Sequence, residues 1–456
     1  MKIAKLLLVI CLSMGFTTGC GTSSESPEQL IRKPMYNEEK QKLEDAVKSL
    51  LNYSSFTLPG NASEVSKINE VDFNSDGINE VIAFEKKQTN DKSEVGFVIL
   101  KNNLDETYTD KWSILVEGDS IEYGNFYDLN NDGSKEIILV VKEDNRFKLY
   151  VYGFENNEIK KLDTFNPTWI ENMYQYTNLK VKIGYLNDDD IIDLLVISHN
   201  PNTNKAILSL VNYDKNLEMI DFIEFENVKN LSDLYITFGN VGKRNNDEIV
   251  KGVIIDIPKS NQNSYITQIV FTNAQNKLKK AFNEDNSEII KAYYIPVDDI
   301  NEDDILDIPI VNGNGHTYTS KSSASVSWNT WNGQEDESSN IVFQSQLYYN
   351  YVHNFKMLIP TRLVNKIEVE QEYQTDIEMY KFNYYNSIDI EPIQLFTISA
   401  VKKKMTEENK NLPNQTNILL SENENYTFLL TINDPEELNR LNIKKEKLSD
   451  YFSLIF

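Results

Sequence analysis

Two short segments combine acidic residues and glycine at the same spacing. Residues Asp72 to Glu80 read DFNSDGINE, and residues Asp128 to Glu136 read DLNNDGSKE. Both carry oxygen-bearing side chains at positions 1, 3, 5 and 9 and glycine at position 6. Ca²⁺ takes roughly six to eight oxygen ligands, and alternate side chains of a tightly coiled loop point inward. Both segments are therefore candidate calcium loops. Their candidate ligands are Asp72, Asn74, Asp76, Glu80, Asp128, Asn130, Asp132 and Glu136.

Three further copies follow at a nearly constant interval. Aligned on the acid at position 9, they start at Tyr185, Asn240 and Asp299, so the five starts are separated by 56, 57, 55 and 59 residues. The copy at 240 places Gly242 and Arg244 at ligand positions, and because arginine repels a cation we interpret this copy as a structural remnant. The candidate ligands of the other two copies are Asn187, Asp189, Asp193, Asp299, Asn301, Asp303 and Asp307.

The same residues also have an interpretation without metal. Asp, Asn and Gly form ordinary turns by hydrogen-bonding their own backbone and by tolerating left-handed conformations. Calcium is favoured at 72 and 128, because a simple turn does not require several acids on one side. The copy at 299 has Asp304 in place of glycine, and the copy at 185 has Tyr185 in place of the first ligand. For these two copies both interpretations stay open.

The interval predicts the fold class. Repetition at this period is typical of solenoids, propellers and arrays, in which one unit is too small to bury its own apolar face. About 57 residues accommodate four strands of ordinary length with their turns. We therefore expect a mainly β fold, a β-propeller of about five four-stranded blades. The strands expected in the first unit are Glu80–Glu85, Val95–Lys101, Lys111–Val116 and Ile121–Tyr127.

The loop pattern D-x-[DN]-x-D-G-x-x-[DE], followed by an apolar strand, resembles the FG-GAP/VCBS-type repeat of integrin-α-like β-propellers. The resemblance covers roughly residues 60–345, and we place the propeller at 60–348. It implies that the loops bind structural Ca²⁺ and stiffen a turn between two strands of a blade. In the integrin family such propellers have seven blades, so up to seven are compatible with the resemblance.

Residues 349–456 contain no repeat loop and predict a small α+β module. The alternative is that they form a sixth and a seventh blade. The segment from Tyr351 to Pro360 resembles the C-terminal part of Firmicutes repeat lipoproteins, which implies no activity. The expected elements are the strands Lys366–Glu372, Met379–Tyr384, Leu395–Val401, Asn417–Leu420 and Tyr426–Ile432, and a helix at Pro435–Phe452.

The N-terminus has the features of an export signal. A positive start is followed by the apolar run Leu6–Phe16 and by small residues up to Cys20. Residues 1–19 resemble a bacterial lipoprotein signal peptide, which implies lipidation of Cys20 and attachment to the outer face of the cytoplasmic membrane. Thr17 stands where that family has Leu, and the alternative is an ordinary secretory signal. Residues 20–35 are expected to form a flexible tether, and residues 36–59 to contain a helix with an apolar stripe.

An aromatic group near residue 320 is a candidate ligand platform. Tyr318, Trp328 and Trp331 lie in or beside a hydroxyl-rich segment, and together they could bind a sugar or a peptide. The alternative is that the tryptophans pack between blades.

Composition excludes some partners and leaves two functions. The chain has 70 acidic and 45 basic residues, a formal net charge of −25, so nucleic acid is excluded as a partner. Its three histidines are isolated, and no motif of a known catalytic class is present. We expect a non-catalytic, membrane-anchored platform that binds an extracellular protein or a cell-envelope polymer. The alternative is an envelope polysaccharide hydrolase or lyase built on a propeller.

Overall fold

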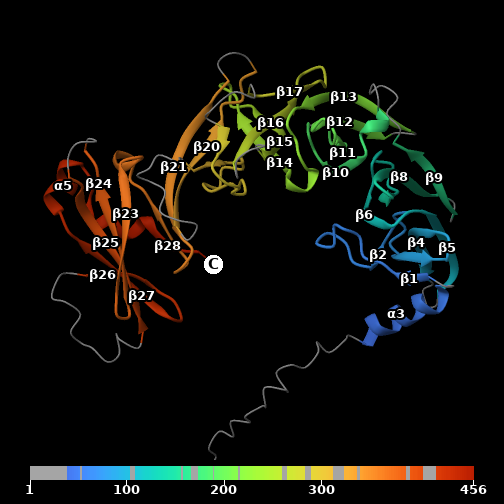
Figure 1. Ribbon diagram of the computed structural model, residues 1–456, viewed down its shortest axis with the longest axis horizontal. Helices are drawn as coiled ribbons and strands as arrows, with labels where there is room; N and C mark the ends of the chain where they lie inside the picture. Colours follow the sequence, from blue (N-terminus) through green and yellow to red (C-terminus); the bar gives the residue numbers. More distant parts are fainter. Residues whose placement is uncertain are drawn as a thin grey trace, which may run out of the picture.

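The computed structural model is mainly β, with several antiparallel sheets and short helices (Figure 1). The signal segment, Cys20, the tether and Tyr318 lie outside the residues that it describes. The described residues are 38–51, 54–102, 108–155, 158–165, 173–187, 189–213, 216–258, 264–282, 289–311, 323–335, 339–386, 391–403 and 417–455.

The first three sheets are antiparallel, and their strands follow chain order. The four strands expected in the first unit are all present, but the last of them, Ile121–Tyr127, belongs to the second sheet. In the first sheet both β1 and β2 pair with β3. The first sheet contains β1 (Ser54–Phe56), β2 (Ile68–Val71), β3 (Glu80–Gln88), β4 (Ser93–Asn102) and β5 (Tyr108–Glu117). The second contains β6 (Ser120–Tyr127), β7 (Glu136–Glu143), β8 (Arg146–Glu155) and β9 (Glu158–Thr164). The third contains β10 (Asn178–Gly184), β11 (Asp193–Asn200), β12 (Lys205–Tyr213) and β13 (Leu217–Phe225).

The fourth and fifth units are joined into one larger sheet by a parallel bridge between Gly242 and Trp331. The fourth unit contains β14 (Tyr235–Lys243), β15 (Ile249–Pro258), β16 (Tyr265–Thr272), β17 (Leu278–Lys280) and β18 (Ile290–Lys291). The fifth contains β19 (Ile308–Ile310), β20 (Ser323–Trp331), β21 (Ile341–Asn350) and β22 (Phe355–Leu358), and β28 (Phe452–Leu454) pairs with β22.

Alternation along the strands explains how the sheets stack. On β7, Ile137 and Leu139 pack toward the first sheet, whereas Ile138 and Val140 pack toward the third. Successive strand residues point to opposite faces, so each central sheet contributes to two cores. Further cores lie between the third and fourth units and between the fourth and fifth. The sheets therefore follow one another along an arc, with β6, β10 and β14 on its inner side and β9 and β13 on its outer side (Figure 1).

The arc is open between its first and last sheets (Figure 1). The outer face of the first sheet is covered by helix α3 (Glu38–Leu50), whose fully buried Val47 packs against Val81 and Ala83. In a closed ring this face would pack against the last blade. Among the described strands, none pairs the first sheet with the last. The described residues therefore show no closed ring, and the number of blades stays a prediction. The expected helix at the N-terminus is confirmed.

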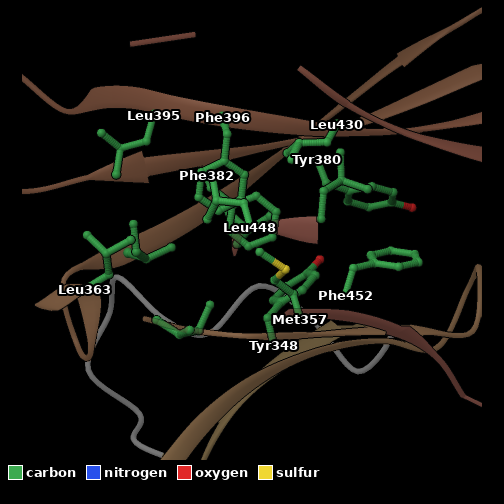
Figure 2. Packing of buried hydrophobic residues seen from close by; sticks show 14 of the residues in the cluster. Tyr348, Met357, Leu363, Tyr380, Phe382, Leu395, Phe396, Leu430, Leu448 and Phe452 are labelled. Atoms are coloured by element: carbon green, nitrogen blue, oxygen red, sulfur yellow. The ribbon is translucent and has the colours of Figure 1, made fainter. Parts of the chain in front are cut away.

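The C-terminal segment forms a separate five-stranded sheet with one short helix, α5 (Pro435–Arg440). The expected boundary at residue 349 falls inside β21. Tyr348 and Met357 of the fifth unit pack into the C-terminal core (Figure 2), so the two parts of the chain share one hydrophobic core. The expected helix at 435–452 stops at Arg440 and is followed by 3-10 turns and β28. The sheet contains β23 (Ile367–Gln374), β24 (Ile377–Tyr384), β25 (Ile393–Lys402), β27 (Tyr426–Ile432) and β26 (Ile418–Glu422), in that order.

Candidate functional site

The loop from residue 72 to 80 joins β2 to β3 and is closed by its own side chains. Asp72 accepts hydrogen bonds from the backbone N–H groups of Asp76 at 3.2 Å and Gly77 at 2.9 Å. Asn74 accepts from the N–H of Asp76 at 3.1 Å, and Asp76 accepts from that of Ile78 at 2.8 Å. Gly77 has φ of +84°, a conformation that costs glycine little. The residue types of the repeat thus dictate a tight turn.

The loops at 128 and 299 repeat this bonding pattern atom for atom. Asp128 accepts from Gly133 N–H at 2.9 Å, and in the other loop Asp299 accepts from Asp304 N–H at 2.8 Å. Asp304 takes the glycine position with φ of +65°, as a short polar side chain permits. In the loop at 185, the two bonds accepted by Asn187 and Asp189 are kept. Sequence repetition therefore reflects structural repetition at these four loops.

The acid at position 9 has a different role, because it is buried. Glu80, Glu136, Asp193 and Asp307 are each at most 4% exposed, and each accepts the backbone N–H of the residue at position 2. Burial, the largest cause, raises the pKa of all four carboxyls, to about 7 for Glu136 and about 6 for the two aspartates. The charged form of each is therefore destabilised in the fold.

The copy at 240 is confirmed to differ from the others. Arg244 pairs with Glu248 of the same loop and with Glu335, whose carboxylate lies 2.5 Å from the guanidinium. A positive group thus occupies the loop, so the structure agrees with the interpretation of a remnant. Its Asn240 nevertheless keeps a structural role, since its side chain donates to the backbone carbonyl of Asp304 at 2.8 Å.

Neighbouring loops are also bonded to one another. Lys135 N–H donates to the carbonyl of Phe73 at 2.8 Å, and Leu306 N–H donates to that of Asn240 at 2.8 Å. In both cases the backbone N–H at position 8 of one loop donates to a backbone carbonyl at the start of the preceding loop. Two pairs of successive units are therefore connected by backbone hydrogen bonds as well as by apolar packing.

The resemblance implies Ca²⁺, for which the side-chain oxygens of these loops are the candidate ligands. No group of three or more His, Cys, Asp or Glu side chains within the described ranges is placed to hold a metal ion. The loop oxygens accept backbone N–H groups instead, although an oxygen with two lone pairs can also bind a cation. In the loop at 299, Oδ1 of the buried Asp307 has no hydrogen-bond partner in the described part of the chain. The oxygen atoms of these loops thus fit the chemistry of Ca²⁺. Among the described residues, however, their carboxylates do not converge on one point.

The aromatic platform is not formed as the sequence suggested. Trp331 is 1% exposed and packs against Phe271 at 4.8 Å between ring centroids, in the core between the fourth and fifth units. Trp328 is 4% exposed and belongs to a different core. Residues three apart on a strand point to opposite faces, so the two rings cannot share one surface. Tyr318 lies outside the described residues.

A cavity that the repeat pattern did not reveal lies on the inner side of the arc. It has a volume of about 350 Å³ and is lined by residues of the second and third sheets, of the connection between β1 and β2, and of the segment between β13 and β14. Glu64 lies at its wall, 3.9 Å from Lys182 Nζ, and accepts a hydrogen bond from Asn125 at 3.1 Å. Lys180 donates to two backbone carbonyls, and burial lowers its pKa. Burial also raises the pKa of the Tyr123 hydroxyl, which keeps it neutral.

This cavity had a weak signal in the sequence. On β10, Lys180 and Lys182 alternate with apolar residues, which is typical of a strand with one polar face. Nothing in the spacing, however, shows that β6 contributes Tyr123 to the same cavity. That juxtaposition arises only from the stacking of the second sheet on the third.

Within the described residues, the structure contains no helix long and apolar enough to cross a membrane. No protein-family model and no curated protein matches the sequence. Among solved structures, the chain is similar to the exotype rhamnogalacturonan lyase YesX, with 12% sequence identity and a TM-score of 0.28. The similarity covers 73% of this chain and 65% of the lyase chain. At this TM-score it supports no conclusion about fold or activity.

Proposed function

We propose that this chain is a lipid-anchored, extracytoplasmic binding platform for a protein or a cell-envelope polymer. The observation that carries the proposal is the cavity on the inner side of the arc, which two stacked sheets and the connections beside them build. Binding sites are commonly concave and combine apolar walls with a few placed polar groups. Here Asn61, Glu64 and Lys182 supply polar groups, and Val140 and Phe147 supply part of the apolar wall.

The proposal is tested by capture from envelope extracts with the chain lacking residues 1–19. Lys182→Ala removes a cation from the cavity wall, whereas Lys279→Ala removes an exposed cation from β17 of the fourth unit. We expect the first substitution to reduce capture of the bound molecule and the second to leave it unchanged. Equal capture by both variants would place the binding surface elsewhere. Turnover of an envelope polysaccharide by the purified chain would support the hydrolase or lyase alternative instead.

We further propose that the repeat units are propeller-type blades whose loops bind structural Ca²⁺. The support is the identical hydrogen-bond pattern in the loops at 72, 128 and 299 and the fit of their donor set. Asp132→Ala should lower thermal stability with Ca²⁺ present, and EDTA should have the same effect on the unsubstituted protein. A melting temperature that is the same in Ca²⁺ and in EDTA would contradict the metal assignment.

The membrane anchor is proposed from the signal resemblance alone. Attachment of the lipid requires the thiol of Cys20, so Cys20→Ser should release the protein into the medium or leave its precursor uncleaved. Fractionation of cells expressing each form measures this. Membrane retention of a processed Cys20→Ser protein would show that another feature holds the chain there.

A further inference from the structure

A second cavity, of about 500 Å³, lies where the fifth repeat unit meets the C-terminal segment. Its walls come from three separate stretches: the first half of β21, the turn after β22, and the segment after α5. Binding sites occur preferentially at such junctions. The cavity is separate from the inner side of the arc and contains none of the repeat loops. It is lined by Phe343, Gln344, Ser345, Gln346, Leu358, Ile359, Pro360, Thr361, Arg362, Val364, Asn442, Ile443, Lys444, Lys447 and Tyr451.

The charge of this cavity is opposite to that of the chain. Arg362, Lys444 and Lys447 line it, and no Asp or Glu does, although the whole chain carries a formal net charge of −25. Within the described ranges, none of these three cations forms an ion pair. A cavity whose wall carries three cations and no acid favours an anionic ligand.

The other lining groups match a hydroxylated ligand. Thr361 and Asn442 are exposed, and in the part of the chain that the structure describes their side chains make no hydrogen bond. Phe343 is 41% exposed at the wall and offers a ring face, while Ile359 and Ile443 are buried beneath. A sugar ring presents both hydroxyl groups and a weakly polar face, so it satisfies both kinds of group.

The volume of this cavity favours a small ligand over an extended acidic peptide. Such a peptide commonly binds by adding a strand to a free sheet edge. The strand that lines the cavity, β21, is paired with β20 along its length but with β22 only from Leu347 to Asn350, so an acidic peptide is included as a competing probe in the test. The volume, in turn, lies within the range of about 300–1,000 Å³ that small-molecule sites occupy.

We propose that this cavity binds an anionic saccharide, with the carboxylate or phosphate of a sugar held by Arg362, Lys444 and Lys447. The guanidinium of Arg362 is suited to paired hydrogen bonds with either group, and the two ammonium groups add charge. This site goes beyond the proposed platform function and does not use the calcium loops. Its binding is therefore unaffected by EDTA.

The test is calorimetric titration of the chain lacking residues 1–19 with defined probes. These are a hyaluronan tetrasaccharide for the carboxylate, glucose 6-phosphate for the phosphate, uncharged chitotetraose as the neutral control, and polyglutamate as the acidic peptide. Lys444→Gln removes a lining cation, and Lys445→Gln removes the adjacent exposed cation, which does not line the cavity. Neither substitution touches a buried side chain, so both proteins should fold.

We expect one or both anionic sugars to bind and chitotetraose not to bind. Lys444→Gln should weaken binding about tenfold, the loss of one charge-assisted hydrogen bond, and Lys445→Gln should weaken it less than about twofold. Which of the two anionic sugars binds identifies the anion. Binding of chitotetraose with equal affinity, binding of polyglutamate alone, equal losses in the two variants, or no binding of either anionic sugar would each overturn the proposal.

Discussion

The substitution Glu136→Gln is expected to stabilise the protein without calcium and to destabilise it with calcium. The carboxylate of Glu136 is 4% exposed and accepts the Leu129 N–H at 2.8 Å. Burial, followed by the nearby charges of Asp132 and Asp128, raises its pKa from 4.5 to about 7. Glutamine keeps a carbonyl acceptor of the same shape and removes the charge that burial penalises.

The size and sign of the effect follow from linkage. The folded state binds the proton of Glu136 more tightly than the unfolded state does. The contribution of this proton to the free energy of unfolding is therefore fully present below about pH 4.5 and is lost as the pH rises through about 7. The difference between the two pKa values corresponds to at most about 3.4 kcal/mol, at about 1.36 kcal/mol per pKa unit. Solvent screening at the edge of an exposed loop reduces it to about 2 kcal/mol. Glu136→Gln should thus raise the free energy of unfolding by about 2 kcal/mol at pH 8 in EDTA and leave it unchanged at pH 4.

Calcium should reverse which of the two proteins is the more stable. A cation held at about a hundred times its dissociation constant stabilises the unsubstituted protein by about 2.7 kcal/mol, and the variant lacks the ninth-position carboxylate that would bind it. Urea unfolding at pH 4 and pH 8, with EDTA and with Ca²⁺, measures both effects. Glu158→Gln, at an exposed position on β9 of the same sheet, is the control and should change neither value.

Two outcomes would refute this reasoning separately. If Glu136→Gln leaves the free energy of unfolding unchanged at pH 8 in EDTA, burial does not penalise the carboxylate. If the order of the two proteins is the same with and without Ca²⁺, this loop is a turn without metal.

Three further substitutions test the packing. Val47→Asp puts an unpaired charge under α3 and should cost about 3 kcal/mol or more in the free energy of unfolding; a loss below about 1 kcal/mol would mean that α3 does not cover the first sheet. Trp331→Ala should cost about 3–5 kcal/mol, whereas Tyr351→Ala, at a 47% exposed position, should cost less than about 0.5 kcal/mol. Lys291→Met leaves Asp256 buried without its partner, 2.8 Å away, and should cost about 3–5 kcal/mol, most of which a second substitution Asp256→Leu should restore. Urea unfolding measures all three.

The strands and loops could be predicted from the sequence because their causes are local. A run such as Tyr426–Ile432 has the β-branched and aromatic residues of a strand, and its expected bounds agree with β27. The loops follow from Asx hydrogen bonds within nine residues, so the spacing of Asp72, Asn74 and Asp76 specifies them directly. The apolar stripe of α3 likewise requires only a count along the chain.

The cavities and the aromatic packing could not be predicted, because they depend on which sheets become neighbours. The spacing of Trp328 and Trp331 suggested a shared surface, but the strand that carries them points them into two cores. Arg362 and Lys444 are 82 positions apart in the sequence and line one cavity only because the segment after α5 returns to the fifth unit. Propensity and periodicity contain no information about such contacts.

Covered ends explain how the repeat units form an open arc. A stacked unit has an apolar face on each side, so an array must either close on itself or have its terminal faces covered. Val47 of α3 covers the first sheet, and the C-terminal segment covers the fifth unit, where Tyr348 and Met357 pack against its sheet and β28 pairs with β22 (Figure 2). In the described part of the chain, segments outside the repeats cover both end faces, so these faces are buried without ring closure. The non-repeated termini therefore limit the length of the array, and the C-terminal segment creates the cationic cavity as it does so.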